Sequence, residues 1–200
     1  MKKFYYFGIA AAGVYAFAVT LGGFLWQSYN PISQAISELI MTTSPNQLIM
    51  QPLFWLYNVL LLIFSIGFFW WASNRALKTA AVALFLVAFS GVMMLLFPQG
   101  VIGEALTTTG LLHLIFAGIA ALATLVTMFA CVLGFKQLAG YKNLMIVSLA
   151  LGLVILINGP MTAIAPTAFP QFFGLTERVT IGAFVLWLFI TSWTLRKKYI

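Results

Sequence analysis

The chain has 200 residues, of which 63% are hydrophobic and 6% are charged, and its formal net charge at pH 7 is +7. A soluble domain carries about 25% charged residues, and a domain of this size has too much surface for its volume to hide so many apolar side chains from water. The composition therefore excludes a water-soluble fold and indicates that lipid is the solvent.

The positive charge does not indicate a nucleic-acid partner. The basic residues stand at the ends of apolar runs and not on one polar face, which is typical of cytoplasmic loops. Cys131 lies inside an apolar run, so no disulfide framework is predicted.

Six apolar runs are each long enough to cross the hydrocarbon core as a helix, the open-ended structure that satisfies its own backbone in lipid. We therefore predict an all-α, polytopic membrane protein in which residues 1–200 form a single transmembrane domain, a six-helix bundle. The predicted spans are residues 4–26, 53–73, 77–97, 108–133, 144–165 and 177–195.

The loop charges predict the orientation. Nine of the ten Lys and Arg residues fall on one side of the predicted spans, and the three Glu residues fall on the other. The nine are Lys2, Lys3, Arg75, Lys78, Lys136, Lys142, Arg196, Lys197 and Lys198. Because Lys and Arg are enriched in cytoplasmic loops, we expect a multi-pass protein of the cell membrane with both termini in the cytoplasm.

The first outer loop, residues 27–52, is the only long one and contains a short amphipathic pattern between Pro31 and Ile40. Apolar residues share one helical face and polar residues share the other. We predict a short helix that lies in the outer interface or folds over the bundle. The apolar face holds Ile32, Ile36, Leu39 and Ile40, and the polar face holds Asn30, Ser33, Gln34, Ser37 and Glu38.

Within the predicted spans and at their outer ends, polar side chains other than small hydroxyls concentrate in the outer half of the bundle, which is where we expect a polar pocket. Such groups are costly at membrane depth and usually face a bundle interior. The candidate catalytic residues are His113, Glu38 and Ser37, and the candidate ligand-binding residues are Arg178, Glu177, Asn30, Ser33, Asn158 and Glu104.

His113, the only histidine, has two interpretations. It could act as a general base or proton relay, with Ser33 or Ser37 as the nucleophile and a Glu as the orienting group. Alternatively, its imidazole is a hydrogen-bonded link between helices. No Gly-x-Ser-x-Gly elbow is present, and one histidine with scattered Glu residues lacks metal-ligand spacing, so neither a metal nor a cofactor is predicted.

Arg178 is the one cation on the outer side, and we expect it to have a carboxylate partner. Adjacent helical residues do not face each other, so Glu38 or Glu104 is a better candidate than Glu177. The pair would either contribute to a ligand site or pin the first loop to span six. Asn158, next to Gly159-Pro160, predicts a weakened or kinked span five.

Residues 29–39, Tyr-Asn-Pro-Ile-Ser-Gln-Ala-Ile-Ser-Glu-Leu, resemble the first-loop signature of the DUF998 family of prokaryotic membrane proteins. The chain also resembles later signatures of that family at Phe97-Pro98, at the isolated His113 and in the run from Gly174 to Arg178. The family often carries an acidic residue after Phe-Pro, where this chain has Gln99-Gly100. The resemblance covers nearly the whole chain and implies a fold and a membrane location but no reaction.

Three functional hypotheses follow. The first is a protein that binds or processes a lipid headgroup or a small polar ligand on the outer face, with membrane lipids as partners. The second is a proton-coupled small-molecule transporter, and the third is a structural or accessory subunit without catalysis. The oligomeric state is left open by the sequence.

Overall fold

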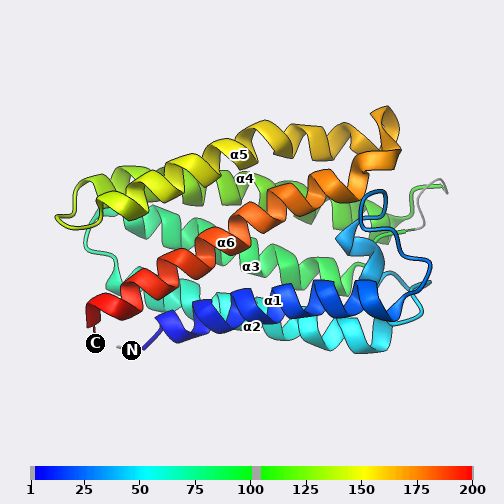
Figure 1. The fold of residues 1–200 in the computed structure, drawn as a ribbon, viewed down its shortest axis with the longest axis horizontal. Helices are drawn as coiled ribbons and strands as arrows, with labels where there is room; N and C mark the ends of the chain where they lie inside the picture. Colours follow the sequence, from blue (N-terminus) through cyan, green and yellow to red (C-terminus); the bar gives the residue numbers. More distant parts are fainter. Residues whose placement is uncertain (1–2, 101–104, 200) are drawn as a thin grey trace.

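The computed structural model describes residues 3–100 and 105–199. The described chain is helical and contains no strand. Both ends of the chain lie at the same end of an elongated bundle (Figure 1). The elements are α1 (Tyr5–Leu25), η1 (Ile36–Ile40), α2 (Gln47–Trp71), α3 (Arg75–Leu96), α4 (Thr108–Lys136), α5 (Lys142–Ala168), η2 (Pro170–Phe172) and α6 (Phe173–Tyr199).

The predicted six-span architecture is confirmed. Six of the described helices are long and apolar enough to cross a membrane. The largest boundary difference is at α2, which begins at Gln47 and not at residue 53, with Pro52 inside the helix. Proline removes one backbone donor but has a helix-compatible φ, so the helix can start upstream of it. The helix α5 likewise continues through Pro160 and Pro166 to Ala168.

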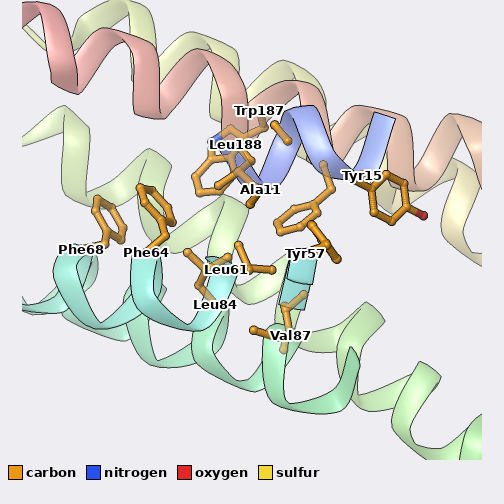
Figure 2. Packing of buried hydrophobic residues seen from close by; sticks show 14 of the residues in the cluster. Ala11, Tyr15, Tyr57, Leu61, Phe64, Phe68, Leu84, Val87, Trp187 and Leu188 are labelled. Atoms are coloured by element: carbon orange, nitrogen blue, oxygen red, sulfur yellow. The ribbon is translucent and has the colours of Figure 1, made fainter. Parts of the chain in front are cut away.

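The six long helices close into a ring. Each packs against the next helix in the chain, and α6 packs back against α1. Inside the ring, Leu61, Phe64, Leu84 and Leu188 are fully buried (Figure 2). Trp187 of α6 is also fully buried, and its indole N–H donates to Ser148 Oγ of α5 at 2.9 Å.

The end of the bundle opposite the termini carries the long connections, and we call it the loop end. It is formed by residues 26–46, by the segment around Phe97–Gln99 and by Pro170–Phe172. The 26–46 loop lies at this end beside the start of α6 (Figure 1). A loop that packs on the bundle must satisfy its buried backbone N–H and C=O groups. The hydrogen bonds between this loop and the helices therefore determine which polar groups at the loop end stay accessible.

The predicted short helix in this loop is present as η1, a 3-10 helix that begins at Ile36. It folds over the bundle and buries Ile36 and Leu39, whereas Ile32 is half exposed. The helix does not reach back to Pro31, because Asn30 Oδ1 accepts from the Ile32 backbone N–H and stabilises a turn there instead.

Candidate functional site

Arg178 lies in the second turn of α6 and binds the 26–46 loop. Its guanidinium donates to the carbonyls of Gln34 (2.8 Å) and Gly174 (3.0 Å) and to the hydroxyl of Tyr29. It also lies over the Tyr29 ring, 5.3 Å from the centroid. The side chain is half-buried. Arg178 therefore cross-links two points of the loop to its own helix through neutral acceptors.

The residues before Arg178 complete this attachment. The Glu177 carboxylate accepts from the Ile36 backbone N–H, and the Leu175 N–H donates to the Ile32 carbonyl at 2.9 Å. Gly174 allows the close approach, because a Cβ added there would lie 2.1 Å from the Gln34 carbonyl oxygen. We use the name clasp for five of the residues that make these contacts: Tyr29, Gln34, Gly174, Glu177 and Arg178.

The predicted ion pair between Arg178 and Glu38 is not formed. Both Glu38 oxygens are used inside the loop, where they accept from the Ala35 backbone N–H at 2.8 Å and from the Gln34 side-chain amide at 3.1 Å. This is the N-terminal capping of η1, which the spacing of charges along the sequence does not reveal. Glu104, the other predicted partner, lies outside the described residues.

Tyr29 gives the clasp a dependence on alkaline pH. Its hydroxyl donates to the Ala35 carbonyl at 2.8 Å, and burial raises its pKa from 10 to about 12 against the opposing effect of Arg178. Since the folded pKa is raised, the stabilisation by Tyr29 is fully present below about pH 10 and is lost as the pH rises through about 12. We expect proteolysis within residues 26–46 to increase over that range.

The matched variant is Tyr29→Phe, which should be cleaved at a rate that does not change between those pH values. The tyrosinate absorbance difference between the two proteins reports the titration of Tyr29 directly. A difference spectrum that titrates at pH 10 would contradict the effect of burial.

His113 and Ser37 bind the same segment but not each other. His113 is buried, and its Nδ1 donates to the Phe97 carbonyl at 2.9 Å, since a carbonyl can only accept. Ser37 Oγ donates to Gln99 Oε1 at 2.5 Å. Within the described residues no hydrogen bond joins Ser37 to His113. Ser37 connects η1 to the segment after α3, and His113 connects α4 to the same segment.

Asn158 joins α5 to α6 next to the clasp. Its side-chain amide donates to the Thr176 carbonyl at 2.6 Å and to Thr180 Oγ1 at 2.7 Å. Thr162 Oγ1 lies 3.1 Å from Thr180 Oγ1 and completes the cluster. Asn158 therefore positions the helix that carries Arg178.

The other predicted binding residues lie in the loop itself. Asn30 is exposed and its backbone N–H donates to Gln34 Oε1 at 2.7 Å, and Ser33 is half-buried. Tyr29 and Gly174 are clasp residues that the polar pattern alone did not single out. Tyr29 lies in the first signature run, residues 29–39, and Gly174 lies in the later run, Gly174–Arg178. The resemblance to the family was therefore the feature of the sequence that could have identified them.

A groove of about 480 Å³ lies between α1 and α6 and leads away from the clasp. Its walls are small or apolar and include Ala12 and Gly13 of α1 and Gly182 of α6. Arg178 and Ile36 line it at the loop end. The arrangement combines one cation with an apolar trough, which suits a molecule that has an anionic group and a hydrocarbon chain.

Residues 9–194 match the model of a protein family described as a protein of unknown function, DUF998. No curated protein and no solved structure is similar enough to the chain to be matched. The matched range includes α2 to α5, most of α1 and α6, the 26–46 loop and the clasp. The chain belongs to the DUF998 family.

Proposed function

We propose that this multi-pass membrane protein binds an anionic amphiphile from the outer leaflet of the cell membrane, with Arg178 holding the headgroup. The observation that carries the proposal is the position of Arg178 at the loop end of the α1–α6 groove. Its described hydrogen bonds all go to neutral acceptors, so no hydrogen-bonded ion pair occupies the guanidinium, and the nearby Glu177 carboxylate interacts with it through charge.

The hydrogen-bonding capacity of Arg178 supports this role. A guanidinium has five N–H donors, and three hydrogen bonds to the loop and to Gly174 account for three of them in the described part of the chain. The remaining donors can bind a phosphate or carboxylate with charge-assisted bonds. Partial exposure of the side chain gives the anion access.

The outward orientation of the loop end is part of the proposal. Nine of the ten Lys and Arg residues flank the opposite end of the bundle or belong to its connections, and Lys and Arg are enriched on the cytoplasmic side. Both termini would then be cytoplasmic, and Arg178 would lie near the outer headgroups.

The packing of α5 favours binding over transport. A proton-coupled transporter needs a polar path from Asn158 toward the terminal end, but the next turns of α5 contain the buried residues Ile155 and Gly152. Further along, Ser148 is buried and accepts from the Trp187 indole. In the described part of α5 these side chains are engaged in packing and not in a polar path.

A structural or accessory role is the second candidate, and the clasp itself favours it. Glu177, Arg178 and Leu175 each bind backbone atoms of the 26–46 loop. On this hypothesis Arg178→Gln lowers the stability of the loop and leaves lipid preference unchanged.

A lipid titration tests the proposal. The purified protein in uncharged detergent is titrated with phosphatidylglycerol and with phosphatidylcholine of the same chains, and native mass spectrometry measures occupancy. Both lipids offer a phosphate to Arg178, but phosphatidylcholine also carries a choline cation beside it, and juxtaposed like charges disfavour binding. We expect phosphatidylglycerol to bind roughly tenfold more tightly. Arg178→Gln should remove this preference, and Arg178→Lys should retain part of it, because lysine keeps the charge but not the planar fork.

Tyr29→Phe is the matched control, because it removes one partner of Arg178 in the clasp and keeps the cation. It should retain the preference for phosphatidylglycerol. Equal binding of the two lipids by the wild-type protein, or an unchanged preference in Arg178→Gln, would overturn the proposal.

A further inference from the structure

We infer that the α1–α6 groove seats one acyl chain of the bound amphiphile, from Arg178 at headgroup level to Phe189 near the middle of the membrane. This inference rests on the proposed function and specifies the ligand as a lipid that enters from the side. The groove is lined by both named residues and has a volume of about 480 Å³, within the range of about 300–1,000 Å³ for small-molecule sites.

The two helices that form the groove converge at the terminal end and diverge toward the loop end (Figure 1). At the terminal end they touch, since a Cβ added at Gly8 of α1 would lie 2.0 Å from Ser192 Oγ of α6. At the loop end, Ile36 and Arg178 line the groove. The groove therefore has a closed apolar end and a polar end that carries the cation.

The glycines in the groove differ from those at helix contacts. A Cβ added at Gly13 or Gly182 would have no neighbour within 4 Å, whereas one at Gly22 would lie 2.8 Å from Met50 Sδ. Close helix packing, the usual reason for glycine in a membrane helix, does not apply at Gly13 and Gly182. Their effect is to leave space between α1 and α6.

The length of the groove matches one leaflet. Phe189 is eleven positions after Arg178 on α6, which at a rise of about 1.5 Å per residue is roughly 16 Å. Half of a hydrocarbon core of about 30 Å is roughly 15 Å. A chain whose headgroup binds Arg178 would therefore end beside Phe189.

Photolabelling with a phosphatidylglycerol that carries a diazirine near the methyl end of one chain tests the inference. In the wild-type protein in phosphatidylcholine bilayers, we expect label to concentrate at the deep end of the groove, on residues 12–13 and 185–189. Excess unlabelled phosphatidylglycerol should compete for it, and added phosphatidylcholine should not. Gly182→Leu should lower this labelling by about tenfold, because the leucine side chain would fill the groove and clash with an entering chain.

Gly118→Leu on α4 is the matched control, since Gly118 also has open space around it but lies outside the groove. It should leave the labelling of α1 and α6 unchanged. Uniform labelling of all helices at that depth, or unchanged labelling in Gly182→Leu, would show annular lipid only and overturn the inference. If lipid titration still gives an Arg178-dependent preference for phosphatidylglycerol, the proposed function stands without the groove; loss of that preference refutes both.

Discussion

Replacing Gly174 with alanine is expected to release the 26–46 loop from α6. The new methyl group would lie 2.1 Å from the Gln34 carbonyl oxygen and 2.7 Å from the Pro31 carbonyl oxygen. Both are backbone atoms, so the loop must move as a unit. We expect a loss of about 3 kcal/mol in unfolding free energy, at the upper end of overpacking costs. Faster hydrogen exchange at the Ile36 and Leu175 amides, whose acceptors would separate from them, measures the release.

Gly118→Ala is the control for this variant, because a Cβ at Gly118 meets nothing within 4 Å. It should leave both the exchange rates and the unfolding free energy close to wild type. Wild-type exchange at Ile36 in Gly174→Ala would mean that the loop is not held by the close approach to α6.

Replacing Trp187 with alanine is expected to give the other large effect, a loss of about 4 kcal/mol in unfolding free energy. The side chain is fully buried inside the ring of helices (Figure 2), and truncation of a buried Trp costs about 3–5 kcal/mol through lost contacts and the cavity that remains. Its hydrogen bond to Ser148, which joins α6 to α5, would be lost as well. Denaturant titration in mixed micelles measures the change.

Trp70 provides a control with the same side chain in another environment. It is 70% exposed on α2, so Trp70→Ala should change the unfolding free energy by about 0.5 kcal/mol or less. Similar losses for the two variants would contradict the interior position of Trp187.

On the proposed function, Arg178 links the stability of the clasp to lipid binding. The side chain holds the 26–46 loop and also lines the groove. A ligand that binds the folded protein stabilises it, so a bound anion at Arg178 should also slow hydrogen exchange in the loop. Gly174→Ala and Gly182→Leu separate the two roles, because the first displaces the loop and the second obstructs only the groove.

The catalytic hypothesis rests on depth in the membrane and stays a prediction. His113 and Arg178 both lie near the loop end of their helices, which is why the sequence suggests a shared site. In the ring, however, α4 packs between α3 and α5, whereas the groove lies between α1 and α6. The hydrogen bonds of Ser37 and His113 go to Gln99 and Phe97. These hydrogen bonds do not join Ser37 to His113. A role for either residue in turnover stays a prediction.

The sequence by itself determined the number of spans, their approximate limits and the end of the bundle at which the acidic and amide groups gather. These features follow from the length of apolar runs and from charge placement, which are local properties of the chain. It also determined that a short amphipathic helix follows the first span, but the sequence left open whether this helix lies in the interface or over the bundle, and the burial of Ile36 and Leu39 in the structure decides for the bundle.

Only the tertiary structure decided which groups meet. Arg178 binds carbonyls and the Tyr29 hydroxyl instead of Glu38, because the close approach of the loop at Gly174 brings backbone acceptors to the guanidinium while η1 capping occupies the carboxylate. The groove likewise depends on the divergence of α1 and α6. A sequence gives the depth of each residue along a span, but its angular position around the bundle is set by how the helices pack.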